Sequence, residues 1–296
     1  DNNTITFDVL AEGTYSNCTI RVTDNTSNTS DNLSVSSFTI DITAPTLSSV
    51  TIASNNSVST LATTGHIITL SITSSEAIQT PIVSIAGQAA TETGSGTSWS
   101  AAYTMTNSNT EGSVSLNIGF SDLAGNAGSA VTSTTNGSAV QFDRTSPVLQ
   151  PVDNVTTPTS DNTSLSYIFT STEAGTINYS VCSGSPDNAS AGNNPITFDA
   201  LADGTHSNCK ISVTDNASNT SDNLSVRSFT IGAITPALVE VTPVDTPDND
   251  TTPRYIFFST LSGTISYGGD CRDNNTATAT AGNNIITFDE LAEGPY

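Results

Sequence analysis

The sequence predicts an all-β protein built from small two-sheet units joined in tandem, on three observations. Apolar residues occur in short alternating runs, as at residues 67–72 and 165–169, which is the pattern of half-buried β-strands. No stretch shows the i, i+3, i+4, i+7 apolar spacing of an amphipathic helix. Long motifs also return almost unchanged at distant positions, which indicates internal repeats.

The composition excludes several classes of partner. The 296 residues include 28 acidic and 6 basic side chains, which gives a formal net charge of -22. Nucleic acids and anionic membrane surfaces are disfavoured, because each requires a cationic patch. No apolar run is long enough to cross a bilayer, so we expect no direct membrane insertion in this segment. The hydrophobic share is only 35 %, but its alternating placement predicts folded strands rather than disorder.

Three motifs recur and set the phase of the repeats. They are ITFDVLAEGTYSNC at residues 5–18, which returns at 196–209 and begins again at 286–296, VTDNTSNTSDNLSV at 22–35, which returns at 213–226, and YIFTSTEAGTINY at 167–179, which returns at 255–267. The copies differ at only a few positions and keep the same internal spacing. We therefore expect equivalent copies to fold alike.

The matches predict four parts joined by proline-containing linkers, since proline stiffens a joint and cannot continue a central strand. We name them the N-terminal segment (1–44, the C-terminal half of a unit), the first unit (45–145, complete, without cysteine), the second unit (146–235, complete, with a disulfide) and the C-terminal segment (236–296, the N-terminal half of a unit). Because the outer parts are halves, we expect the chain to be a window on a longer protein. In a rival interpretation, residues 1–44 of one copy complete the unit begun by 236–296 of another, although Tyr15 and Tyr296 would compete for one position.

Strand signals in the second unit predict its fold. The expected strands lie near residues 148–153, 164–170, 175–182, 195–201, 206–214 and 223–231. The turns between them carry Gly, Asn and Asp, which are the residues that tight turns favour. Six or seven short strands at this spacing fit an immunoglobulin-like sandwich. The predicted fold class is therefore all-β, with tandem immunoglobulin-like β-sandwich domains in an extended array.

The four cysteines fit disulfides better than a metal site, because none forms a CxxC or similar ligand spacing. Cys182 and Cys209 fall in neighbouring strands of the second unit, so we expect them to be bonded. Cys18 is the repeat equivalent of Cys209, and Cys271 is the equivalent of Cys182. The partners of Cys18 and Cys271 either lie outside this window or are each other, in successive copies. Disulfides predict an oxidising compartment, and hence an extracellular or cell-surface location.

A family resemblance is carried by four further motifs, namely DITAPTLSSV at 41–50, GSGTSWSAAYTM at 94–105, FSDLAGN at 120–126 and FDRTSP at 142–147. With these motifs the chain resembles the tandem bacterial immunoglobulin-like (Big or cadherin-like) repeats of giant extracellular adhesins and surface-filament proteins. The resemblance covers essentially the whole chain. It implies a stalk that holds a terminal binding module away from the cell, with calcium bound at the joints between domains.

Acidic and amide side chains are expected to meet at two joints, because a loop at the end of each complete unit faces the incoming linker. The expected ligand sets are Asp41, Asp122 and Asn126 at the first joint, and Asp143, Asp215 and Asn219 at the second. Carboxylate, amide and backbone oxygens are the ligands that calcium prefers. In the alternative interpretation the loop aspartate forms an Asx-turn and caps its own backbone. At the third joint Gly232 replaces the aspartate, so we expect no metal and more bending there.

The leading functional hypothesis is a structural repeat region, which serves as stalk, spacer or filament shaft in a large bacterial surface or adhesin-like protein. We expect no catalysis: no P-loop, dinucleotide fingerprint or HExxH is present, and His206 stands where Tyr15 stands in the sister repeat. Expected partners are further repeats or homopolymer copies, with any glycan or host ligand bound elsewhere in the parent protein. The alternative is a carbohydrate- or surface-binding module that uses aromatic residues such as Trp99 and Tyr103.

Overall fold

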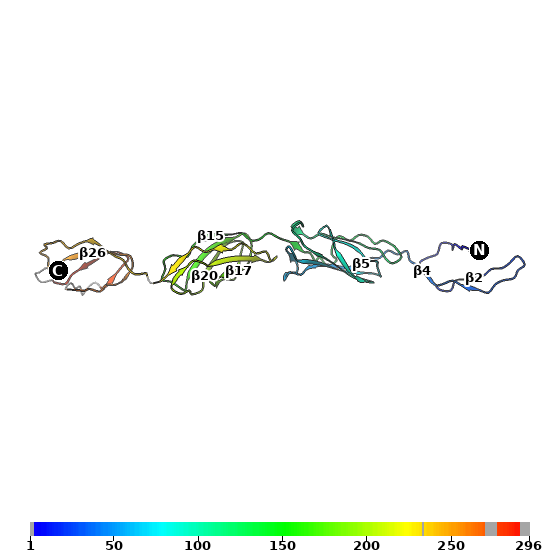
Figure 1. Cartoon of the computed structure of the whole chain (residues 1–296), viewed down its shortest axis with the longest axis horizontal. Helices are drawn as coiled ribbons and strands as arrows, with labels where there is room; N and C mark the ends of the chain where they lie inside the picture. Colours follow the sequence, from blue (N-terminus) through cyan, green and yellow to red (C-terminus); the bar gives the residue numbers. More distant parts are fainter. Residues whose placement is uncertain (1–2, 233, 270–276, 291–296) are drawn as a thin grey trace.

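The chain folds into β-strands and connecting turns over the residues that the computed structural model describes, which are 3–232, 234–269 and 277–290. This confirms the predicted all-β class. Figure 1 shows the four parts arranged in line, with the N-terminal and C-terminal segments at opposite ends. None of the described residues forms a helix that could span a bilayer.

The first unit contains two larger sheets and one small one. Its strands are β5 (Leu47–Ser54), β6 (Leu61–Ala62), β7 (Ile67–Ser74), β8 (Ile82–Ile85), β9 (Gln88–Ala89), β10 (Thr91–Ser95), β11 (Ser98–Thr104), β12 (Gly112–Ser113), β13 (Leu116–Gly119) and β14 (Gln141–Phe142). Antiparallel pairing joins β10, β11, β7 and β5 in this order, and joins β13, β8 and β9 into a second sheet. In the small sheet, β14 lies between β12 and β6 and pairs with β6 in parallel.

Both larger sheets of the first unit turn alternate residues onto one core. In β7, Ile68, Leu70 and Ile72 are buried, whereas the residues between them are at least partly exposed. Ile85 and Ile118 of the second sheet belong to the same buried cluster. Successive side chains of a strand point to opposite faces, so an alternating sequence builds a sheet with one apolar face.

The second unit consists of two four-stranded sheets and one small two-stranded sheet, and the chain crosses between them. Its strands are β15 (Leu149–Asp153), β16 (Leu165–Ser171), β17 (Gly175–Ser180), β18 (Gly184–Ser185), β19 (Asn188–Ala189), β20 (Gly192–Phe198), β21 (Gly204–His206), β22 (Lys210–Asp215), β23 (Leu224–Ser225) and β24 (Phe229–Ile231). One sheet has the order β15, β16, β20, β18, the other has β19, β17, β22, β23, and β21 pairs with β24. Each of the six expected strand regions contains a strand; the short β18 and β19 were not predicted.

The core of the second unit includes a disulfide. Phe169 from one sheet and Val213 from the other are both fully buried in a single cluster. Cys182 and Cys209 are bonded, as the sequence predicted, and both are buried in the same cluster. Cys182 follows β17 and Cys209 precedes β22, so the bond joins the ends of two paired strands.

The two terminal segments have smaller sheets. The N-terminal segment contains β1 (Gly13–Tyr15), β2 (Thr19–Ile20), β3 (Leu33–Ser34) and β4 (Phe38–Ile40). The C-terminal segment contains β25 (Leu238–Thr242), β26 (Arg254–Ser259), β27 (Gly263–Thr264), β28 (Thr278–Ala279) and β29 (Gly282–Thr287). Pairing joins β1 with β4, β2 with β3, β27 with β28, and β26 with both β25 and β29. Several large apolar side chains of the N-terminal segment are exposed, among them Ile5, Phe7, Val9, Val22 and Leu33.

Replacing Cys182 and Cys209 with alanine should destabilise the second unit alone. The bond closes a loop with a sequence separation of 27, and its loss is expected to cost about 3.5 kcal/mol through the larger entropy of the unfolded chain. Calorimetric unfolding should show one transition moved to lower temperature. The first unit, which contains no cysteine, is the internal control, and an equal shift of its transition would contradict the prediction.

Candidate metal centres at the joints

A loop in the first unit is organised around one buried carboxylate. Asp122 is 1 % exposed and closes the loop on itself. Its Oδ1 accepts hydrogen bonds from the backbone amides of Gly125 (2.7 Å) and Asn126 (2.8 Å), and its Oδ2 accepts one from Asn126 Nδ2 (2.7 Å). Gly125 has a φ of 99°, which glycine adopts without strain. The Asx-turn expected as the alternative interpretation is therefore present.

The second unit repeats this loop with the same two bonds from its asparagine. Asp215, at the end of β22, accepts the backbone amide of Asn219 on Oδ1 (2.8 Å) and its side-chain Nδ2 on Oδ2 (3.0 Å). The N-terminal segment has a third copy, in which Asp24 accepts the same two groups of Asn28 at 2.9 Å each. These bonds from Asn28, with others from Thr26, hold the pKa of Asp24 well below its ordinary value.

The loop asparagines also bind the incoming linkers. Asn126 Nδ2 donates to the carbonyl oxygen of Asp41 over 3.1 Å, and Asn219 Nδ2 donates to the carbonyl oxygen of Asp143 over 3.1 Å. Each asparagine therefore donates to the loop carboxylate and to the linker together. Their amide nitrogens face these groups, so both asparagines brace the joint, and metal binding through their side-chain oxygens stays a prediction.

Three carboxylates converge at each of the two joints. Asp41, Glu76 and Asp122 form the first group, which we call the first acidic cluster, and their nearest carboxylate oxygens all lie within 4.8 Å of one another. The second acidic cluster consists of Asp143, Glu173 and Asp215, with the same limit on its distances. The structure thus brings together the aspartates that the sequence singled out at each joint, and it adds one glutamate to each pair.

The glutamates Glu76 and Glu173 were missed from the sequence, although a shared motif marks both. Each follows a strand in a Ser-x-Glu-Ala sequence, at 74–77 and 171–174. The serine hydroxyl donates to the carbonyl oxygen of the glutamate, over 2.5 Å in the first unit and 2.6 Å in the second. This common turn aims both glutamates at the joint.

The clusters concentrate negative charge. Burial raises the pKa of Glu76, and the charges of Asp41 and Asp122 raise it further. Glu173 has a raised pKa for the corresponding reasons, with Asp143 and Asp215 as its neighbours. The ion pair between Arg144 and Glu111, over 3.8 Å, lies outside both clusters.

The donor set fits a hard divalent cation. Each cluster offers carboxylate oxygens from three chain segments, which is the chemistry that calcium prefers, and a cation would offset the mutual repulsion. Burial by itself raises the pKa of Asp122, but the hydrogen bonds from Asn126 and Gly125 outweigh it, so the net shift is downward. Asp122 therefore presents a charged carboxylate to the joint.

Direct contacts between units accompany the second cluster. Asn56 of the first unit is 8 % exposed, and its Nδ2 donates to the carbonyl oxygen of Asn216 over 3.0 Å. Ser218 Oγ donates to Asn56 Oδ1 over 3.3 Å. Thr63 of the first unit donates to Asn219 Oδ1. The loop of the second unit that carries Asp215 is thus held by side chains of the first unit as well.

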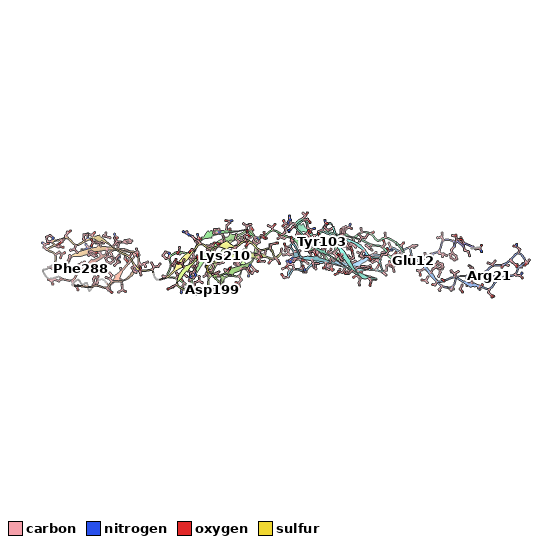
Figure 2. The ribbon with its side chains drawn as sticks, viewed as in Figure 1. Glu12, Arg21, Tyr103, Asp199, Lys210 and Phe288 are labelled. Carbon is pink, nitrogen blue, oxygen red and sulfur yellow. A yellow bond between two sulfur atoms is a disulfide. The ribbon has the colours of Figure 1, made fainter. Side chains whose placement is uncertain are left out.

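The first joint is bridged from the N-terminal segment. Thr43 in the linker donates its hydroxyl to Glu12 Oε2 over 2.6 Å, and its backbone amide donates to Asp41 Oδ1 over 3.1 Å. Glu12, labelled in Figure 2, lies where the N-terminal segment meets the first unit. A shallow depression there is lined by Glu12, Asp41 and Glu76, among others.

Other sequence candidates have packing roles. His206 stacks on Phe229, with 5.3 Å between ring centroids, and its Nε2 lies 2.9 Å from the carbonyl oxygen of Ala202. Tyr15 stacks on Phe38 and donates to the carbonyl oxygen of Ala11 in the same way.

The aromatic and cysteine candidates show no ligand-binding arrangement in the described part of the chain. Trp99 is half-buried against the core of the first unit, and its Nε1 donates to the carbonyl oxygen of Gly96 over 3.1 Å. Tyr103 packs against the same core. Cys18 is a free thiol of intermediate exposure. Cys271, its expected partner in another copy, lies outside the described residues.

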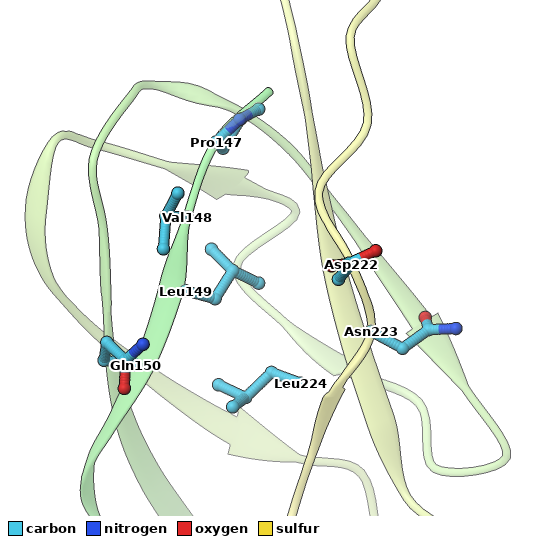
Figure 3. A pocket seen from close by; sticks show the side chains of 7 residues that line it. All are labelled: Pro147, Val148, Leu149, Gln150, Asp222, Asn223 and Leu224. Atoms are coloured by element: carbon cyan, nitrogen blue, oxygen red, sulfur yellow. The ribbon is translucent and has the colours of Figure 1, made fainter. Parts of the chain in front are cut away.

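A hollow of about 220 Å³ lies on the second unit between the edge strands of its two sheets (Figure 3). Leu149 from β15 and Leu224 from β23 approach each other there, as Figure 3 shows. Asp222 is the only charged residue of its lining. The hollow is a gap between sheet edges and brings together no group of catalytic side chains.

No protein-family model matches the chain, and a comparison with curated proteins found no significant match. The resemblance to bacterial immunoglobulin-like repeats therefore stays a prediction. The geometry of the joints is independent of it, because both clusters are formed by residues of this chain alone.

Calcium should bind the chain without substitutions, called the parent chain from here on, with a Kd of roughly 10⁻⁴–10⁻³ M, measured by isothermal titration calorimetry. Glu76→Gln and Glu173→Gln should each weaken one site by about tenfold or more, because each removes a carboxylate from one cluster. Asp199→Asn, at an exposed position away from both clusters, is the matched control. Parent-like calcium binding by the double glutamine variant would contradict the assignment.

Without calcium, the clusters should make stability depend on pH. The pKa values of Glu76 and Glu173 are raised in the folded chain. Their protonated forms therefore stabilise the fold below the ordinary glutamate pKa of 4.5, and this stabilisation is lost as pH rises through the folded pKa. In EDTA, the double glutamine variant should lose less stability than the parent between pH 4 and 7, as measured by thermal unfolding. An identical pH profile for both chains would disprove the coupling.

Proposed function

We propose that this chain is the shaft of a large extracellular surface protein, with units joined in a stiff row and no catalytic role. The joints are the observation that supports this most directly: at two of them, linker, loop and neighbouring unit are tied by hydrogen bonds beside an acidic cluster. The in-line arrangement in Figure 1 supports a role in reach. The Cys182–Cys209 disulfide fits an oxidising compartment outside the cell.

We further propose that the units are immunoglobulin-like sandwiches. In the second unit, residues of two four-stranded sheets share one core, which supports this fold. Immunoglobulin-like domains commonly carry a tyrosine whose hydroxyl bonds to backbone a few residues upstream, just before a strand cysteine. Tyr15 donates to the carbonyl oxygen of Ala11 and precedes Cys18 by three residues, which supports the same assignment for its unit.

Calcium is the proposed cofactor of the shaft. In each cluster the linker aspartate belongs to the joint, whereas the other two acids belong to the unit that follows. A cation shared among them would connect linker and unit by ionic bonds in addition to the asparagine bridge. The joint would then resist bending, because bending would separate the ligands.

The alternative of a carbohydrate-binding module has less support. Trp99 and Tyr103, the aromatic residues considered for sugar stacking, pack against the core of the first unit. Packing of this kind uses the ring faces that a sugar would need. Binding of the parent chain to a glycan array would nevertheless favour this alternative over the shaft.

Small-angle scattering tests the shaft directly. The parent chain should give a rod-like distance distribution, and calcium at a few millimolar should lengthen the mean end-to-end distance by removing bent conformations. The Glu76→Gln/Glu173→Gln variant should give the same profile with calcium and with EDTA. A compact, globular profile for the parent chain under both conditions would refute the proposal.

A further inference from the structure

A turn at one end of the first unit reaches across to the second unit. Residues 63–66 connect β6 to β7, and the backbone amide of His66 donates to the carbonyl oxygen of Thr63 over 3.1 Å. Gly65 has a φ of 89°, which glycine adopts without strain. Thr63 donates its hydroxyl to Asn219 Oδ1 in the second unit. The turn is therefore part of the joint between the two complete units.

The imidazole of His66 closes this turn from the other side. The backbone amide of Thr63 donates to His66 Nδ1 over 3.1 Å. A backbone amide can only donate, so Nδ1 is the acceptor nitrogen and the ring proton is on Nε2. The bond therefore exists only with a neutral imidazole. A protonated ring carries a hydrogen on both nitrogens and would turn one N–H group toward another.

Thr63 transmits this constraint to the linker through Asn219. Asn219 is buried, and its side-chain nitrogen donates to Asp215 Oδ2 over 3.0 Å and to the carbonyl oxygen of Asp143 over 3.1 Å. A continuous row of contacts thus runs from His66 through Thr63 and Asn219 to the linker. The row begins at a histidine, the side-chain type that changes charge near physiological pH.

The second histidine of the chain has the opposite arrangement. The sequence contains two histidines, His66 and His206. His206 Nε2 lies 2.9 Å from the carbonyl oxygen of Ala202, which is an acceptor, so a protonated ring keeps this bond. Both residues belong to the second unit. His66 is therefore the histidine whose bond depends on the neutral ring, and His206 is an internal reference.

The charged groups that face this end of the first unit lie on the linker, on the second unit and on one loop of the first unit. They are Asp143, Arg144, Asp215, Glu173 and Glu111. Arg144 pairs with Glu111 over 3.8 Å and donates to the carbonyl oxygen of Asn107, whose side chain accepts the hydroxyl of Thr64. The carboxylates outnumber the guanidinium, and a negative environment is compatible with a protonated imidazole.

We propose that the joint between the first and second units is acid-sensitive. Protonation of His66 breaks its bond with the Thr63 amide, frees the turn and withdraws the Thr63 hydroxyl from Asn219. The two units keep their folds but lose part of their fixed relative orientation. The inference goes beyond the proposed shaft, and it needs no calcium, so it holds or fails independently of the proposed metal centres.

Acid acts in the opposite direction on the second acidic cluster. Protonation of Glu173 lessens the repulsion from Asp143 and Asp215, which would tighten the joint. A joint that loosens on acidification therefore has the wrong sign for the cluster and the right sign for His66.

Nuclear magnetic resonance of the ¹⁵N-labelled 296-residue chain in EDTA tests the proposal, at about pH 7.5 and at about pH 5, the range over which an imidazole changes charge. The ¹⁵N shifts of the ring report the tautomer and protonation of His66. Residual dipolar couplings report the relative orientation of the two units, which should fit one alignment tensor at the higher pH. At the lower pH the ratio of loose to fixed joints should rise about two- to tenfold, the effect of one hydrogen bond.

Two variants at position 66 separate the hydrogen bond from the charge. His66→Asn supplies an amide oxygen that accepts the Thr63 amide at any pH, so its joint should stay fixed in acid. His66→Phe has no acceptor, so its joint should be loose at both pH values. Far-UV circular dichroism and thermal unfolding verify that the variants keep the folded units.

A third variant tests the contact between the units. In Thr63→Val the imidazole of His66 still gains its proton, but the hydroxyl that reaches Asn219 is gone. The orientation of the units should then be looser at both pH values and should no longer respond to acid. This arm and His66→Asn keep the proposal testable if His66→Phe fails to fold.

Three results would overturn the proposal. A proton on Nδ1 of His66 near pH 7.5 would remove the bond on which it depends. An orientation that stays fixed while His66 gains its proton would show that the turn does not control the joint. Equal loosening of the parent and His66→Asn chains in acid would assign the response to other groups.

Discussion

The joints depend on one arrangement, an asparagine amide that holds a loop carboxylate and a linker carbonyl together. Asn126 and Asn219 each do this, and in each case the aspartate four residues earlier accepts a hydrogen bond from its own loop on each carboxylate oxygen. The carboxylates are thereby fixed before any cation arrives. A preorganised site loses little conformational freedom on binding, which matters for ligands as weak as those of extracellular calcium modules.

The sequence was sufficient for the features that depend on local pattern. Alternation in β7 and β16 predicted strands with one buried face, and the repeat motifs placed equivalent turns correctly. The Cys182–Cys209 bond also followed, because β17 and β22 are neighbours and a short cross-strand distance is all that it needs. These features require information from a few adjacent residues, or from two strands whose pairing the repeat itself implies.

The sequence was insufficient where distant segments converge. Glu76 lies 46 positions from Asp122 in the chain, and only the sheet arrangement brings its carboxylate to the joint. The Ser-x-Glu-Ala motif is visible in both units. Only the fold shows that its turn directs the glutamate toward the joint. The asparagines were expected as ligands because an amide can present oxygen. Their nitrogens donate to the linker, a bracing role that the residue type alone does not reveal, and the ligand role of their oxygens stays a prediction.

Comparison of the repeats shows that the aspartate loop is kept in every copy, whereas the acidic residues beside it are not. Asp24 and Asn28 keep the two asparagine bonds of the loop in the N-terminal segment, so the same turn forms in all three copies of the motif. At the linker that follows the second unit, by contrast, aspartate and glutamate are replaced together, by Gly232 and Leu261. A structural turn would tolerate either acid alone. Two distant positions that are acidic together at two joints and neutral together at the third fit the proposed cation, which would be bound between them.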